Sequence, residues 1–186
     1  SPVQTEALLF MQRFHLLPES YLWGLADVLI ATEGRVTFIL GEVYATGQWF
    51  FFPATFLMKS PVSLLILLAL APFILWKLKI GREIRFLLVP PLVFFTAAMT
   101  SGLNIGLRHI LPVFPFLILI AALTAWRLVS NFSAGRWVVG AMLGWQVVSS
   151  LHAFPNYITY GNELIGGPAN AHRYMTDSSV DWDQGI

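Results

Sequence analysis

The sequence contains no cysteine and has few charged residues, and both absences limit what the protein can be. Without cysteine, the chain can form neither disulfides nor thiolate metal sites. Only 11% of the 186 residues are charged, whereas an ordinary soluble domain carries about 25%. The hydrophobic share is 56% and the mean hydropathy is +0.68. This composition predicts that lipid, rather than water, surrounds most of the chain.

Other signals are missing too. The net charge of +1 gives no reason to expect a nucleic-acid partner, and we find no repeats and no nucleotide-binding glycine loop. The four histidines are too dispersed for a recognisable metal signature. The chain opens on "SPVQTE", without an initiator Met or a basic signal-peptide region. We therefore expect an internal piece of a longer protein, cut at both ends.

Four apolar stretches are long enough to be membrane spans. A helix needs roughly 20 apolar residues to cross the hydrocarbon core of a bilayer. Internal prolines would break a soluble helix, but neighbouring helices in a membrane bundle can satisfy the freed carbonyls. Burial of four such helices in a large soluble protein is the less favoured alternative. The predicted spans are residues 62–78, 86–103, 110–128 and 137–154.

The basic residues orient these spans. Six of the eleven Lys and Arg residues flank two short connections, after the first span and after the third. The positive-inside rule assigns that side to the cytoplasm. The opposite, extracytoplasmic side then receives residues 1–60, the loop before the third span and residues 155–186. The predicted location is a bacterial inner or plasma membrane, with the functional face outside the cytoplasm.

The first sixty residues differ from the spans. They mix Leu, Phe and Trp with charged residues, which predicts two amphipathic helices on the outer membrane surface. Pro18 followed by Glu19 predicts the start of the second helix, and Gly34 its end. The aromatic stretch 44–61 is expected at the interface or as a re-entrant piece. The predicted fold is an all-α, polytopic membrane protein with three parts, 1–60, 61–154 and 155–186.

Three basic residues are expected near the outer headgroup region. Lys59 precedes the first span, and Arg108 and His109 precede the third. Charges at this depth are costly unless they are paired or bind an anion. Snorkelling of a long side chain into the interface would also explain any one of them. Together they indicate a phosphate site, because Arg offers a bidentate fork and Lys a point charge.

Acidic residues on the same face could do complementary work. Sugar transfer needs a carboxylate to deprotonate an acceptor or to stabilise oxocarbenium-like charge. Clustered aspartates could also bind a divalent cation, although the sequence requires no cofactor. For each residue alone, a solvated loop position is the favoured interpretation. The candidates are Glu42, Glu163, Asp177, Asp181 and Asp183.

Three stretches together resemble a known family. They are "EGRVTFILGEVYATGQWFFFPATFLMKSP", "GLNIGLRHILPVFPF" and "YITYGNELIGGPANAHRYMTDSSVDWDQGI". In this order they are similar to bacterial dolichyl-phosphate-mannose-protein mannosyltransferase-like proteins, which are glycosyltransferases of the GT-C superfamily. The resemblance covers most of the chain. In the last stretch Ser179, Asp183 and Gly185 stand where the family commonly has Asn, Gly and Asp.

The resemblance implies an integral-membrane enzyme that moves a sugar from a polyprenyl-phosphate carrier to a protein, lipid or glycan acceptor outside the cytoplasm. Lys59, Arg108 and His109 would then bind the carrier phosphate. Asn162 and Glu163, in the "NELIGGP" motif, would belong to the donor or acceptor site. The family's leading catalytic acid lies in a loop that we expect upstream of this chain, so this piece alone is expected to be inactive.

Two other functions remain open. A transporter or flippase for lipid-linked saccharides would place polar residues in the middle of the spans. Here the span middles hold nothing more polar than Thr, Ser or Gln146. A non-catalytic membrane scaffold would leave the polar outer residues as ordinary loops.

Overall fold

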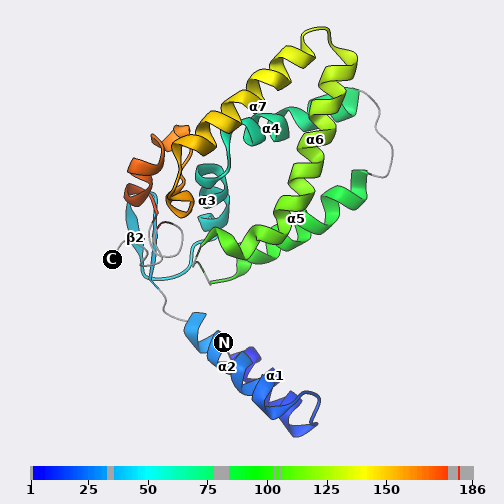
Figure 1. Cartoon of the computed structure of the whole chain (residues 1–186). Coiled ribbons are helices and arrows are strands. Elements are labelled where there is room, and N and C mark those ends of the chain that lie inside the picture. Colours follow the sequence, from blue (N-terminus) through cyan, green and yellow to red (C-terminus); the bar gives the residue numbers. More distant parts are fainter. Residues whose placement is uncertain are drawn as a thin grey trace.

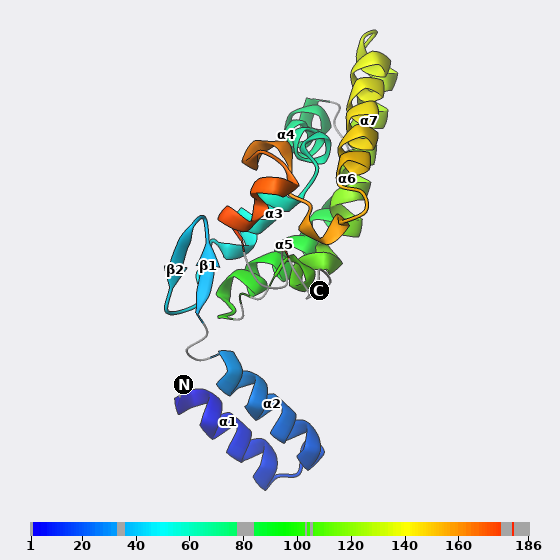
Figure 2. The same cartoon turned by 60° about the vertical axis from the view of Figure 1, so that its left-hand side comes forward.

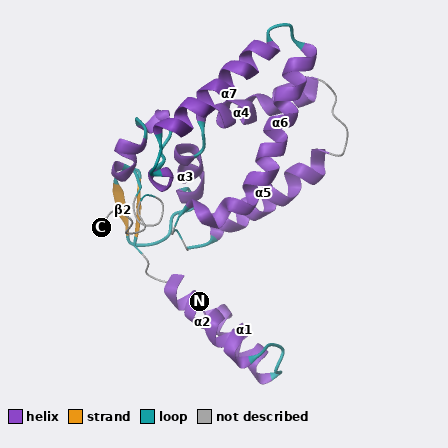
Figure 3. Ribbon diagram, in the orientation of Figure 1, coloured by secondary structure: helices purple, strands orange, loops and turns teal. Residues whose placement is uncertain are grey.

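The computed structural model describes residues 2–32, 36–77, 84–102, 104, 106–175 and 180 (Figure 1). Most of these residues are helical, and the strands among them form one small hairpin (Figure 3). The all-α prediction is confirmed at this coarse level. In chain order the elements are α1 (Pro2–Arg13), α2 (Glu19–Thr32), β1 (Thr37–Ile39), β2 (Glu42–Tyr44), α3 (Phe51–Lys59), α4 (Val62–Lys77), α5 (Ile84–Thr100), the 3-10 helix η1 (Leu107–Val113), α6 (Phe114–Asn131), α7 (Gly135–His152), and the short 3-10 helices η2 (Tyr157–Thr159), η3 (Glu163–Ile165) and η4 (Pro168–Arg173).

The helices α1 and α2 form a hairpin that stands apart from the other elements in both views (Figures 1 and 2). The helix α2 begins at Glu19, as predicted, whereas the predicted end at Gly34 lies outside the described residues. Large apolar side chains of this hairpin remain exposed, with Trp23 at 64% and Ile30 at 69%. Their apolar surface is therefore available to lipid or to further protein.

The hairpin of β1 and β2 was not predicted from the sequence. The two strands pair antiparallel, with Ile39 opposite Glu42. Leu40 and Gly41 make the turn at φ of 55° and 85°, the left-handed values that favoured hairpin turns require. Ile39 is fully buried, and the Leu40 N–H donates to the carbonyl of Tyr174 at 2.8 Å. Contacts with the distant C-terminal segment thus hold the short strands in place.

The main core surrounds α3. Apolar side chains from β1, α3, η1 and η4 meet there, so segments from both halves of the sequence share one interior. We call this region, together with the loop 153–162, the compact end of the molecule. Its buried cluster consists of Ile39, Phe51, Phe52, Met58, Ile110, Val113, Ala171 and Met175.

The four long helices α4 to α7 extend away from the compact end. The helix α6 contacts α4, α5 and α7, and α4 also contacts α7 (Figures 1 and 2). The Ser63 hydroxyl donates to the Gln146 side chain, which joins α4 to α7 through a polar pair. At the α6–α7 turn, a Cβ on Gly135 would lie 2.0 Å from the carbonyl oxygen of Leu128, so this close turn requires glycine.

Helices occur at all four predicted spans, but their lengths differ from the prediction. The continuous helical stretch Leu107–Asn131 has 25 residues and a hydropathy of 2.0, which suffices to cross a membrane. The helices Phe51–Lys59 and Val62–Trp76 are together also long and apolar enough to cross a membrane, although the chain bends by 116° between them. The helix Ile84–Thr100 is apolar but shorter. By length and composition, the described residues thus contain one membrane-capable helix, or two if the bent pair is one span.

Two ends of the helical layer can be distinguished in Figure 1. The end of α4, the start of α5 and the α6–α7 turn lie at the end far from the β-hairpin. Arg85, Arg127 and Arg136 fall at helix ends there. The compact end, with α3, the β-hairpin and η2 to η4, lies at the opposite side. The basic helix ends and the candidate site residues are therefore separated by the length of the helices.

Candidate functional site

An apolar groove of about 710 Å³ lies among α3, α4, α5, η1 and α6. Its walls are almost entirely hydrocarbon and aromatic, and two prolines inside helices, Pro72 and Pro91, contribute to them. Proline within a helix leaves a carbonyl without its usual partner and spreads the backbone locally. The groove therefore offers space for an extended apolar group. Phe56 and Leu57 of α3 form the part of the wall nearest to Lys59 in sequence.

Lys59, the last residue of α3, places a cation within one helical turn of the groove. Its ammonium donates to the carbonyl of Ile158 at 2.7 Å. Burial lowers the pKa of the Lys59 ammonium from 10.5 to about 8, because a low-dielectric surrounding disfavours the charged form. An anion at this position would stabilise the ammonium further.

Asn162 is fully buried and holds the C-terminal end of α3. Its side-chain amide donates to the carbonyls of Leu57 and Ser60, and its backbone N–H donates to that of Met58 at 2.9 Å. Its side-chain oxygen accepts from the Leu164 N–H at 3.1 Å. The last carbonyls of a helix have no partner inside it, so a residue from elsewhere must satisfy them. The contacts of Asn162 thus serve to fix the loop 158–167 against α3.

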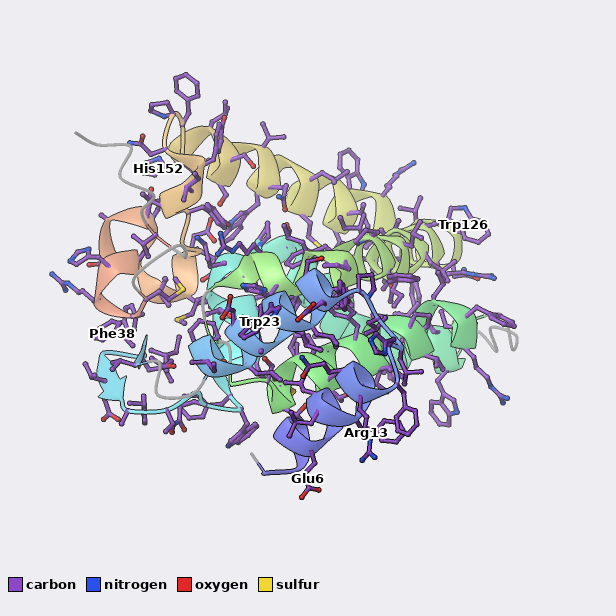
Figure 4. All side chains as sticks on the ribbon, turned by 90° about the horizontal axis from the view of Figure 1, so that it is seen from below. Glu6, Arg13, Trp23, Phe38, Trp126 and His152 are labelled. Atoms are coloured by element: carbon purple, nitrogen blue, oxygen red, sulfur yellow. The ribbon has the colours of Figure 1, made fainter. Side chains whose placement is uncertain are left out.

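A second pocket of about 550 Å³ lies beside the C-terminal half of α7, with a few polar groups set in a mainly apolar wall. We call it the polar pocket because of these hydroxyl and carboxyl groups. Trp145, Ser149 and His152 line it from one face of α7, since residues three and four apart are neighbours on a helix. Tyr160 and Glu163 line it from the following loop. Figure 4 shows His152 at the end of α7, next to this loop.

The polar groups of this pocket bond to one another. The Trp145 indole N–H donates to Glu163 Oε1 at 3.0 Å, and the hydroxyls of Ser149 and Tyr160 are 3.1 Å apart. Partial burial opposes ionisation of Glu163, but hydrogen bonds from Ser149, from its own backbone and from Trp145 outweigh it and lower the pKa of the carboxyl. Burial, with the nearby Glu163 charge, raises the pKa of Tyr160. The pocket therefore presents a carboxylate beside a protonated phenol.

The other predicted phosphate ligands lie elsewhere along α3. Asn104 donates to the Gln48 carbonyl at 3.0 Å near the start of α3, and the rings of Phe56 and Phe114 are 5.7 Å apart near its end. Arg108 and His109 belong to η1, which runs beside α3 between these two contacts. Lys59 is the last residue of α3. Arg108 is exposed and His109 is partly buried. A joint phosphate site remains a prediction.

Of the remaining predicted acids the structure describes only Glu42, which lines neither pocket. Glu42 lies on the exposed strand β2, where its carboxylate accepts from the Tyr44 hydroxyl at 2.8 Å and raises the pKa of that phenol. Asp177, Asp181 and Asp183 lie outside the described residues, so the suggestion of a cation there remains a prediction. Within the described part of the chain, no group of three or more acidic or histidine side chains is arranged to hold a metal ion.

The structure thus brings together three of the predicted residues, Lys59, Asn162 and Glu163, around the end of α3. The sequence analysis missed Trp145, Ser149 and Tyr160. Trp145 and Ser149 share one face of α7, which the sequence shows as a four-residue spacing. Tyr160 lies in the loop that closes the pocket, and the sequence gives no sign that this loop lies against α7. No family model matches the chain, and no curated protein or solved structure is significantly similar to it.

Proposed function

We propose that the chain is part of an integral-membrane glycosyltransferase that takes a sugar from a polyprenyl-phosphate carrier and transfers it to an acceptor outside the cytoplasm. The observation that carries this proposal is the apolar groove, whose wall includes Leu57, two residues before Lys59 on α3. A polyprenyl phosphate has the same two parts, a long hydrocarbon tail and an anionic head. In this arrangement the groove would hold the tail and Lys59 the phosphate.

The surface of the helical layer favours a lipid surrounding. Only 28% of the most apolar window of Leu107–Asn131 is buried, whereas the core helix of a soluble protein would be mostly buried. Trp76, Phe86 and Trp137 are 82%, 80% and 72% exposed, and Figure 4 shows Trp126 pointing away from the helices. A soluble monomer seldom exposes so much contiguous apolar surface.

The separation of the two ends also supports this orientation. Basic residues at the far helix ends suit the cytoplasmic side of a membrane. Lys59 and the polar pocket then belong to the opposite, extracytoplasmic side. The same side would meet the catalytic acid that the family resemblance expects upstream of this chain.

Lys59 would serve the reaction through charge. Transfer breaks the bond between the sugar C1 and the phosphate oxygen, and the acceptor oxygen forms the new bond to C1 while its proton passes to the catalytic carboxylate expected upstream of this chain. Negative charge therefore grows on the departing phosphate. A cation already in place stabilises that charge more in the transition state than in the bound carrier. Lys59 can do this without donating its proton.

The test is binding of a polyprenyl phosphate and of the matching uncharged polyprenol to the full chain in lipid nanodiscs. We expect Lys59→Ala to weaken binding of the phosphate by about tenfold, as lost hydrogen bonds to charged groups do, and to leave the polyprenol unaffected. Leu117→Trp, which fills the groove, should weaken both lipids. Its matched control is Ile118→Trp, because the adjacent Ile118 is 53% exposed.

Equal affinity of the Lys59→Ala variant and the unsubstituted chain for polyprenyl phosphate would exclude Lys59 as the phosphate ligand. Equal effects of Leu117→Trp and Ile118→Trp on lipid affinity would exclude the groove as the site of the lipid tail, and would contradict the proposed function.

A further inference from the structure

We propose that the polar pocket between α7 and the loop 160–168 binds a neutral sugar ring. The inference names the substrate class for the extracytoplasmic side of the proposed transferase and rests on that proposed function for its biological meaning. The pocket itself supplies the argument. It is separate from the apolar groove, since it is lined by α7 and the following loop instead of α3 to α6.

The pocket combines an aromatic face with several hydroxyl and carboxyl groups. The Trp145 side chain is 54% exposed, and its bond to Glu163 fixes the orientation of the indole. A flat aromatic surface suits the C–H face of a pyranose, which is apolar. The edge of a pyranose carries hydroxyls, and these need both donors and acceptors. Ser149, Tyr160 and Glu163 provide them within one small space.

The hydrogen-bonding capacity of these groups exceeds what they use among themselves. A carboxylate has roughly four acceptor positions, and a hydroxyl both donates and accepts. Because Ser149 has a single proton, donation from Tyr160 to Ser149 and from Ser149 to Glu163 satisfies all three groups in a chain. Lone pairs on the carboxylate and the phenol then remain for ligand hydroxyls. A chain of this kind orients its members for a ligand that offers many donors.

Charge argues against two other ligand classes. Among the described residues that line the pocket there is no Lys or Arg, while Glu163 is negative, so a phosphate or carboxylate ligand would be repelled. An amine would be attracted by the carboxylate and by the indole face. The Trp145 N–H and the Ser149 hydroxyl already offset part of the carboxylate charge, which favours a neutral ligand with several hydroxyls.

The pocket also has a suitable position and size. Its volume of about 550 Å³ lies within the usual range for small-molecule sites, roughly 300–1,000 Å³. Glu163 follows Asn162, whose side chain is bonded to the carbonyls of Leu57 and Ser60 on either side of Lys59. The loop 158–163 therefore carries both the carbonyl that meets Lys59 and the carboxylate of the pocket. A sugar in the pocket would lie beyond the phosphate end of the carrier.

The experiment measures binding of three soluble probes to the full chain by saturation-transfer NMR: methyl α-mannopyranoside, methyl β-glucopyranoside and methyl β-galactopyranoside. Their blocked C1 prevents transfer, so the signal reports recognition of the ring alone. We expect at least one to bind, and Glu163→Gln and Trp145→Phe each to weaken it by about tenfold. Trp137→Phe is the matched control for Trp145→Phe, and Ser150→Ala is the matched control for Ser149→Ala. All four residues lie on α7. These controls should leave the affinity unchanged.

Absence of binding by all three probes would overturn the proposal, and so would tighter binding of mannose 6-phosphate or glucosamine. Equal loss in Trp137→Phe and Trp145→Phe would also overturn it. Polyprenyl phosphate binding is measured on the same variants and shows that they are folded. Sugar binding can thus fail while lipid binding persists, or the reverse, so this inference and the proposed function fail separately.

Discussion

The compact end around α3 and the helix α7 are both apolar in sequence, yet they use their apolar side chains in opposite ways. At the compact end, Ile39, Phe52 and Ile110 are at most 1% exposed. On α7, Val148 and Leu151 are 66% and 67% exposed. One region has its packing partners within this chain, whereas the other presents a surface for lipid or for further protein. Hydrophobicity alone therefore does not reveal which apolar residues form a core.

The strongest test of this contrast replaces one Phe in each kind of surroundings. Phe52→Ala would leave a cavity beside α3 and should lower the free energy of unfolding by about 4 kcal/mol. Phe86→Ala, at a position that is 80% exposed on α5, should change it by less than about 0.5 kcal/mol. Urea unfolding in detergent micelles, followed by circular dichroism, measures both. Equal losses in the two variants would mean that α5 is packed against something as closely as α3.

A polar residue should matter almost as much at the compact end. Asn162→Ala removes the donors that satisfy the carbonyls of Leu57 and Ser60, which then stay buried without those bonds. We expect a loss of about 3 kcal/mol in the same unfolding measurement, since each unsatisfied buried group costs about 1–3 kcal/mol. The exposed Asn156 is the matched control, and Asn156→Ala should have little effect. A small loss for both would show that the end of α3 is held mainly by apolar contacts.

The same contrast explains what the sequence could predict. Long apolar runs marked the positions of α4 to α7, because a helix in apolar surroundings needs little else. The β-hairpin was missed, because its strands are three residues long and its turn contains Leu40 instead of the usual Asn or Gly. Its strands depend on bonds to Tyr174 and Met175, far along the chain. Such distant pairings leave no local pattern.

The candidate site follows the same rule. Lys59, Asn162 and Glu163 could be singled out as polar residues on the outer side, but their roles differ in ways that only the tertiary contacts decide. The amide of Asn162 reaches residues more than 100 positions earlier in the chain. In the sequence, Trp145 and Ser149 have the pattern of ordinary span residues, because no local signal indicates that the loop 160–168 lies against them.

The compact end also holds a half-buried cation, Lys59, and its titration gives the smallest of the predicted effects. The Lys59 ammonium loses its proton above about pH 8, while a phosphate monoester stays doubly charged above about pH 7. Affinity for polyprenyl phosphate should therefore fall about tenfold from neutral pH to about pH 10, a cost of ~1.4 kcal/mol. A bound phosphate favours the charged ammonium and moves the midpoint to higher pH. Binding of the uncharged polyprenol should not change.

Lys59→Arg is the control, because a guanidinium stays charged throughout this range and should abolish the pH dependence. Folding stability should respond in the opposite direction. Since burial sets the pKa of Lys59 at about 8 instead of 10.5, the unfolded chain binds more protons between these values. The free energy of unfolding of the lipid-free chain should accordingly rise with pH in that window. Lipid affinity that rises together with stability would mean that the phosphate does not meet this ammonium.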